Sequence, residues 1–524
     1  MKYADRISKK TQMKFGGLNR NRGAGDGELQ DMENMTGDYY PLLASRRPRR
    51  LLKLLEAPGA IFNHHGLGWI AGGQLYVGGV ARGAVSPGIK QVVTVGNNIF
   101  VFPDKVYYNT ENGIFGSMES CWEGDVLTFC DGEIYGEAAK SNTIQAEGVE
   151  WAEYFKPGDA VTITGCTLQP ENNKTPIVRE IDGDKLIFSE YAFQLPEDAA
   201  YSEEGPLKIS RTVPDLLHVF EHENRLWGCS TDTIYSSKWN DPFNFSVYDG
   251  IASDSWTVTP FSQGEFTGGI GYKGYPIFFK EDRIYKIYGS VGTDFQAIDS
   301  ASLGLSEGSS GSLAVAGELL FYLNDRGVMA YGGGIPDSAH EAFGGCRYRN
   351  AVAGSDGLNY YISMEDDSGW GLYVFNTENG MWHKQDSLHV THFATVAGVL
   401  HMLDDQGQVW TVDGQEGTLE DDVQWFAEFT DFTEEDPNKK SLGKVQIRLE
   451  LGEGATAQCY VMFDSDGVWH PVGAQLQTDV KRSYYLPVIP RRCDHYKLKI
   501  TGKGEVYIHS ITRETSSGSE LRRH

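Results

Sequence analysis

The sequence has no stretch that resembles a membrane span or a secretion signal. None of its 524 residues belongs to an apolar run near the length of about 18 residues that a membrane-spanning helix needs. The opening residues, MKYADRISKKTQMKFGG, carry several charges but no apolar core, unlike a secretory leader. We therefore expect no membrane span, and a chain that is made and folded in a cytoplasm.

Cysteine is sparse, and its spacing excludes two common kinds of site. The number is odd and no Cys-x-x-Cys pair occurs, so neither a zinc knuckle nor a thioredoxin-like redox site is indicated. We expect free thiols that pack as small apolar groups. The seven residues are Cys121, Cys130, Cys166, Cys229, Cys346, Cys459 and Cys493.

Positive charge and helical periodicity are both in short supply. The chain has 46 Lys and Arg against 72 Asp and Glu, a formal net charge of −26. A surface of this sign does not wrap nucleic acid, because phosphate binding needs a basic footprint. It does keep a large oligomer soluble. No segment has a long apolar stripe at helical spacing with recognisable caps, so we expect an all-β protein with only short helical turns.

Familiar catalytic and ligand-binding motifs are incomplete. The Gly-rich 332–337 lacks the GK[ST] ending of a phosphate loop, and the GxSxG match at 304–308 has no helix after it. His64 and His65 are adjacent and would face opposite ways on a strand, while 464–467 begins like a calcium loop without its later ligands. The sequence thus indicates no enzyme, no cofactor and no metal site.

The feature that recurs is a pair of short apolar strands joined by a turn. Alternating apolar residues suit a pleated sheet, and Gly, Asp or Asn supplies each turn. Repetition at steps of roughly 40 residues is typical of a β-propeller, and we expect six or seven blades. The phrases lie at 72–79, 96–109, 223–237, 274–289, 317–333, 358–384 and 398–414.

Changes in this rhythm predict the domain boundaries. The break after 116 predicts an inserted small β-barrel-like domain, and the longer alternating strands after 415 predict a β-sandwich of jelly-roll type. The predicted parts are an extended basic arm (1–53), the first blades (54–116), the inserted domain (117–211), the remaining blades (212–415), the sandwich (416–515) and a flexible tail (516–524).

The basic arm and one aromatic loop are the candidate contact sites. Arg46, Arg47, Arg49 and Arg50 flank Pro48, which favours an extended path whose side chains alternate in direction. The arm can bind its own acidic body or a neighbouring subunit, and we expect that removing residues 1–50 spares the propeller but weakens assembly. Trp239, Phe243 and Phe245 flank an Asn-Asp-Pro turn, where they can contact sugar or a neighbour, or fold back over the blade.

Several phrases together resemble the tail nozzle, or tail hub, proteins of short-tailed bacteriophages. Each phrase is weak by itself, but they occur in the family's order over roughly residues 10–110 and 212–415. The phrases are FGGLN (15–19), DGEL (26–29), DMENM (31–35), SRRP (45–48), NRLWG (224–228), IYSS (234–237), DPFNF (241–245), FFKEDRIYKI (278–287), Gly304, Gly308 and GV (327–328). The chain departs from the pattern near Leu51, where Gly is usual, and at 117–211.

The resemblance implies a structural virion protein. It would be one of six copies in a ring below the portal and adaptor proteins, in contact with tail fibres or spikes, with double-stranded DNA passing through the channel without sequence-specific binding. It would be made in the host bacterial cytoplasm and end in the phage tail. An acidic channel wall fits this role, since it offers phosphate groups no binding partner.

Two other functions stay open on the sequence alone. One is a carbohydrate-binding or carbohydrate-cleaving tail-associated β-propeller, because propellers serve enzymes and binding proteins alike. The other is a cellular scaffold, although no WD or kelch signature is present. The state of assembly separates them, because a nozzle forms rings with its adaptor whereas a glycosidase acts alone.

Overall fold

The computed structural model describes residues 6–188, 191–196, 199–421, 423–435, 438–477 and 480–517. Strands account for 54% of the chain and helix for 3%, which confirms the all-β prediction. The helical elements include four single 3₁₀ turns: η1 (Trp151–Glu153), η2 (Pro170–Asn172), η4 (Ser310–Ser312) and η5 (Glu341–Phe343).

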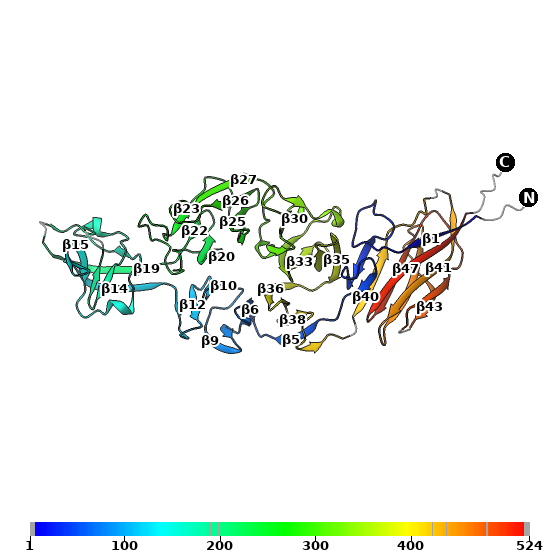
Figure 1. Ribbon diagram of the computed structural model, residues 1–524, viewed down its shortest axis with the longest axis horizontal. Helices are drawn as coiled ribbons and strands as arrows, with labels where there is room; N and C mark the ends of the chain where they lie inside the picture. Colours follow the sequence, from blue (N-terminus) through cyan, green and yellow to red (C-terminus); the bar gives the residue numbers. More distant parts are fainter. Residues whose placement is uncertain are drawn as a thin grey trace, which may run out of the picture. The chain divides into compact units, whose positions relative to one another are not determined.

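The protein is a β-propeller, as the repeated hairpins predict, and seven antiparallel sheets follow the hairpin phrases (Figure 1). Residues up to 56, 61–67 and from 305 onward form one compact unit, here called the sandwich unit. The remainder, 57–60 and 68–304, forms the insertion unit. The insertion unit holds four propeller sheets, and the first of them shares β6 and β7 with the other unit. The first two sheets are β6 (Pro58–Asn63), β7 (Leu67–Ala71), β8 (Gln74–Val77) and β9 (Val80–Ala84), and β10 (Gln91–Val95), β11 (Asn98–Phe102), β12 (Val106–Asn109) and β13 (Phe115–Ser117). The next two are β20 (His218–His222), β21 (Arg225–Cys229), β22 (Ile234–Ser236) and β23 (Trp256–Val258), and β24 (Gly268–Tyr272), β25 (Tyr275–Lys280), β26 (Arg283–Tyr288) and β27 (Gln296–Ala301).

The sandwich unit holds the other three propeller sheets. Their central strands are buried on both faces: every residue from Asn359 to Met364 of β33 is buried, so the strand reads as a continuous run rather than as an alternation. These sheets are β28 (Ala314–Ala316), β29 (Leu319–Asn324), β30 (Gly327–Tyr331) and β31 (Asp337–Ser338); β32 (Arg349–Ser355), β33 (Asn359–Asp366), β34 (Gly369–Asn376) and β35 (Met381–Asp386); and β36 (Val390–Val396), β37 (Val399–Asp404), β38 (Gln408–Val412), β5 (Arg50–Leu54) and β39 (Thr418–Leu419).

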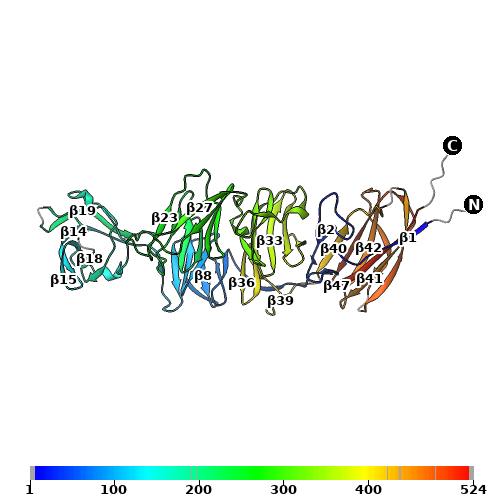
Figure 2. The ribbon, with the colours of Figure 1, turned by 45° about the horizontal axis from the view of Figure 1, so that its top comes forward.

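The range expected to hold an inserted domain contains one six-stranded sheet with a core of its own. Trp122, Trp151 and Phe129 are buried in this core, and the sheet order is β16-β19-β14-β15-β18-β17. Figure 2 labels β14, β15, β18 and β19 of this sheet. Its strands are β14 (Ser120–Ile134), β15 (Glu137–Gln145), β16 (Thr162–Thr164), β17 (Glu180–Asp182), β18 (Lys185–Ile187) and β19 (Tyr201–Arg211).

The C-terminal β-sandwich is assembled from both ends of the chain. Its strands alternate between buried and solvent-facing residues, as in β42, and buried residues of both sheets share one hydrophobic core. The first sheet contains β1 (Arg6–Gln12), β3 (Met35–Thr36), β4 (Leu43–Ser45), β41 (Lys440–Leu451), β44 (Arg482–Pro487), β45 (Arg492–Cys493) and β47 (Val506–Ser517). The second contains β2 (Leu29–Glu33), β40 (Gln424–Phe429), β42 (Thr456–Phe463), β43 (His470–Leu476) and β46 (Tyr496–Lys503).

Of the two binding modes expected for the basic N-terminal segment, the structure shows the one in which it pairs with its own chain. β1 and β4 pair with β47, β2 pairs with β40, and β5 pairs with β38 of the last propeller sheet. The physical reason is that edge strands need partners, and this segment supplies them to the sandwich and then to the propeller. Phe15, Leu18 and Leu29 are buried in the same core as Trp382 of β35, which joins the sandwich to the propeller within the unit.

Candidate functional site

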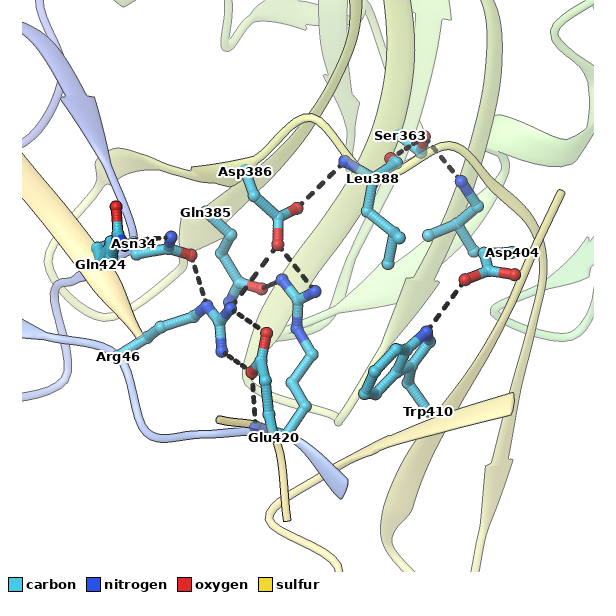
Figure 3. Close-up of polar contacts among 12 residues, drawn as sticks. Asn34, Arg46, Ser363, Gln385, Asp386, Leu388, Asp404, Trp410, Glu420 and Gln424 are labelled. Carbon is cyan, nitrogen blue, oxygen red and sulfur yellow. Dashed lines mark hydrogen bonds and ion pairs between the residues drawn. The ribbon is translucent and has the colours of Figure 1, made fainter. Parts of the chain in front are cut away.

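The arginine cluster lies where the chain leaves β4 of the sandwich and enters β5 of the propeller. The Arg46 side chain is almost fully buried and donates from Nε to the Asn34 side-chain oxygen at 2.7 Å. Its two terminal nitrogens donate to the two carboxylate oxygens of Glu420 at 2.7 and 3.0 Å (Figure 3). This fork-to-fork geometry is the strongest form of a charged hydrogen bond.

Arg49 completes the cluster from the other side. Its guanidinium lies 2.8 Å from Asp386 and donates to Gln385 at 2.6 Å, while its backbone N–H donates to Glu420 at 3.0 Å. Burial by itself would raise the pKa of the Asp386 carboxyl, but Arg49 and Arg46 outweigh it and hold that pKa below its usual value. Two guanidinium groups are thus matched by two carboxylates, as desolvated charges require.

Of the other two arginines, Arg47 faces solvent and Arg50 is partly buried. Arg47 is two-thirds exposed, donates to the Tyr39 hydroxyl at 3.1 Å and lies 3.5 Å from Asp413, while Arg50 donates to the Gly417 carbonyl at 3.3 Å. The expectation that all four arginines bind a neighbouring subunit or adaptor needs correction for Arg46 and Arg49. Their guanidinium groups are buried against carboxylates of their own chain.

The aromatic loop is mostly packed inward. Phe245 is 3% exposed in a propeller core, and Phe243 stacks edge-on against Tyr107 at 4.8 Å between ring centroids. Trp239 remains half exposed. Contact roles for Phe243 and Phe245 are corrected accordingly, because Asn244 between them is anchored to Asp159 at 2.9 Å and turns both rings toward the core.

The feature that sequence reasoning missed is a cleft of about 480 Å³ in the sandwich unit. Its floor consists of buried polar side chains, among them Asn359, His383 and Gln385. Three exposed carboxylates lie on its rim, those of Asp38, Glu378 and Asp413. Arg47 and Tyr39 also line the cleft there. The lining residues come from β3 and the loop after it, from the arginine segment, from the turn before β33, and from the strands or strand ends of β33, β34, β35 and β38.

Local hydrogen bonds fix two parts of this cleft. Asp356, in the turn before β33, accepts from the backbone N–H groups of Leu358 and Asn359 at 2.9 and 2.7 Å and from the Tyr361 hydroxyl at 3.2 Å. Burial lowers the pKa of His383 to about 4, so its imidazole is neutral at pH 7. Since the lining comes from six separate stretches of chain, no spacing in the sequence could have brought it together.

The described residues contain neither a metal-binding cluster nor a membrane-spanning helix. No group of three or more His, Cys, Asp or Glu residues in them is arranged to hold a metal ion. None of the helices there has the length and apolar character that a membrane crossing requires. All seven cysteines are free thiols, four of them buried.

No family model and no curated protein matches the chain. Among solved structures it is similar to an exo-β-1,3-galactanase from Phanerochaete chrysosporium with galactose, at 10% identity and a TM-score of 0.23, covering 56% of this chain and 95% of that one. It is also similar to a GH43 glycoside hydrolase engineered to display endo-xylanase and exo-arabinofuranosidase activity, at 11% identity and a TM-score of 0.21, covering 58% and 97%.

These similarities correct one expectation. The sequence indicated no enzyme, yet the two solved structures named above are glycoside hydrolases, so the exclusion of enzymes is withdrawn. At such identities and TM-scores the similarity carries no reaction and no substrate over to this chain.

Proposed function

We propose that the chain is a structural subunit of a bacteriophage tail, a nozzle or hub protein that forms a closed ring below the portal and adaptor. In that place it would continue the channel through which double-stranded DNA is retained and ejected, and it would meet tail fibres or spikes. The mature protein would reside in the virion.

One observation carries this proposal. The N-terminal phrases that resemble the nozzle family lie at successive points of a single joint rather than in unrelated loops. Gly17 packs on the Trp382 carbonyl of β35, Leu29 pairs with β40 of the sandwich, and Arg46 binds Glu420. Sequence phrases that all lie at the joint between sandwich and propeller support a fold shared with the nozzle family better than matches in unrelated loops would.

Exposed apolar loop tips also support assembly. Phe261, Ile335 and Ile489 are almost completely exposed, and each adjoins a proline that stiffens its loop. Rigid apolar anchors of this kind are typical of protein interfaces. A cyclic ring uses two different faces of each subunit, so several separate tips are expected rather than one continuous patch.

The test is the state of assembly of the full chain, alone and mixed with its adaptor, measured by mass photometry. We expect ring species, with six copies by resemblance to the family. Phe261→Asp should shift the population toward monomer, whereas Val126→Asp, at a half-exposed site in the insertion, serves as the matched control. A strictly monomeric protein at every concentration, with adaptor present, would contradict the proposal.

Carbohydrate binding is a second candidate function, and one observation favours it. The cleft of the sandwich unit combines buried amide and imidazole groups with rim carboxylates, and together these groups can donate to and accept from the hydroxyl groups of a ligand. Ring assembly and a glycan site are compatible on one chain, so the two functions require separate tests.

A further inference from the structure

We infer that the cleft of the sandwich unit binds an uncharged saccharide of one or two rings, held between Tyr39, Asn359 and Asp413. This inference rests on the second proposed function, carbohydrate binding, and names its site and ligand class. It is independent of ring formation.

The size of the cleft suits a small ligand. Its volume of about 480 Å³ lies within the range of roughly 300–1,000 Å³ that is usual for small-molecule sites. Apolar side chains of Leu358, Val374 and Val412 contribute to the lining beside the polar ones. A sugar ring presents the same mixture, with C–H groups on its faces and hydroxyl groups around its edge.

The charges of the lining disfavour an anionic ligand. Arg46 and Arg49 are already matched by Glu420 and Asp386, which leaves Arg47 as the exposed cation of the lining. Against it stand three exposed rim carboxylates, Asp38, Glu378 and Asp413. Phosphate, sulfate or uronate groups would meet net repulsion, whereas sugar hydroxyl groups can donate to these carboxylates.

The floor carries polar atoms that lack a partner. Asn359 Oδ1 and Arg49 Nε are buried and have no hydrogen-bond partner among the described residues, although both residues line the cleft. Such groups are costly to leave unpaired, and an approaching hydroxyl group can satisfy either kind because it both donates and accepts. His383 adds an imidazole that is neutral at pH 7, since burial lowers its pKa to about 4.

The experiment titrates the full-length protein with a panel of neutral disaccharides, namely maltose, cellobiose, lactose and xylobiose, by calorimetry and by saturation-transfer NMR. Galacturonate and spermine serve as anionic and cationic probes. We expect saturable millimolar binding of at least one neutral disaccharide and none of galacturonate.

Three variants locate the site. Leu358→Trp fills the cleft from an exposed rim position, and Asp413→Asn removes one rim charge; we expect each to weaken binding by about tenfold or more. Asp367→Asn, at a fully exposed carboxylate away from the cleft lining, is the matched control and should bind as the parent does.

Each other outcome overturns a defined part of the inference. Disaccharide binding that survives Leu358→Trp would leave carbohydrate binding intact but place it elsewhere. Absence of binding by every disaccharide would overturn both the site and the second proposed function. Spermine binding that is lost in Leu358→Trp, without disaccharide binding, would assign the cleft to a cationic ligand instead.

Discussion

Arg46 and Glu420 form a bidentate ion pair although 374 positions separate them in the chain. Glu420 follows the last strand added to the propeller, and Arg46 follows β4 of the sandwich. The backbone N–H of Glu420 also donates to the Arg49 carbonyl at 2.9 Å. The pair therefore joins the incoming and outgoing connections between two domains of one unit (Figure 3).

The first prediction concerns removal of Glu420. Glu420→Ala leaves the buried Arg46 guanidinium without its bidentate partner, and we expect a loss of about 3 kcal/mol in the free energy of unfolding of the sandwich unit. Urea unfolding followed by tryptophan fluorescence measures it. Asp413→Asn, which removes the charge of the exposed pair with Arg47 and tolerates the positive φ of this position, should cost only about 0–1 kcal/mol. Equal losses in both variants would show that burial of the pair does not matter.

The second prediction concerns the pH dependence of stability. Burial lowers the pKa of His383 from 6.5 to about 4, so the unfolded chain binds a proton more readily between these values than the folded chain does. Stability contributed by this group is therefore present above pH 6.5 and is lost as the pH falls toward 4. His383→Gln should flatten the urea midpoint across that window, whereas His65→Gln, at an exposed site, should not. A slope that His383→Gln leaves unchanged would assign the acid sensitivity to other groups.

Local pattern predicted most of the propeller, because each hairpin is encoded within a few residues. Leu320 pairs with Tyr331 and Asn324 with Gly327, all inside one phrase. The N-terminal strands have no such local signal, since β1 pairs only with β47 near the other end of the chain. Their basic side chains indicated an exposed arm, although the charge of Arg46 is satisfied inside the protein. The cleft also has no local signal in the sequence, because Asp38 and Asp413 come together on its rim only when the chain folds.

The third prediction replaces the expectation that residues 1–50 are dispensable for folding. Deletion of residues 1–54 removes strand partners from β40, β47 and β38, so we expect the sandwich unit to become insoluble or protease-sensitive. The sheet of β14–β19 has its own core and should stay folded. Limited proteolysis with mass spectrometry distinguishes the two regions. Deletion of residues 1–12 alone removes a single edge strand and is the milder control. A truncated 55–524 chain with a protected sandwich would refute the structural role of this segment.

The fourth prediction concerns a buried ion pair in the insertion unit. Lys90 Nζ lies 2.6 Å from an Asp104 carboxylate oxygen, and both side chains are more than nine-tenths buried. Lys90→Met removes the cation from the buried Asp104 carboxylate and leaves it only the Ser86 N–H and hydroxyl as partners, so we expect a loss of about 3 kcal/mol. The double variant Lys90→Met with Asp104→Leu should recover most of that loss, because no buried charge remains and the exposed Ser86 groups that Asp104 accepted from can bind water. Thermal unfolding of the parent, both single variants and the double variant completes the cycle. If the double variant is as unstable as Lys90→Met, the loss reflects packing and not charge.

The last prediction concerns Gly17, the second glycine of the phrase FGGLN. A Cβ at this position would stand 2.4 Å from the Trp382 carbonyl oxygen, which also accepts the Leu18 N–H at 2.7 Å. The neighbouring atoms are the Trp382 backbone oxygen and nitrogen and Met381 Cβ, none of which is the end of a flexible side chain, so Gly17→Ala must separate the N-terminal segment from β35. We expect a loss of about 1–3 kcal/mol, as for overpacked cores, and a lower midpoint of thermal unfolding. Gly23→Ala is the matched control, because nothing lies within 4 Å of a Cβ built there. The glycine is thus required by close backbone approach at the joint between sandwich and propeller, and a Gly17→Ala protein as stable as Gly23→Ala would show that this joint tolerates separation.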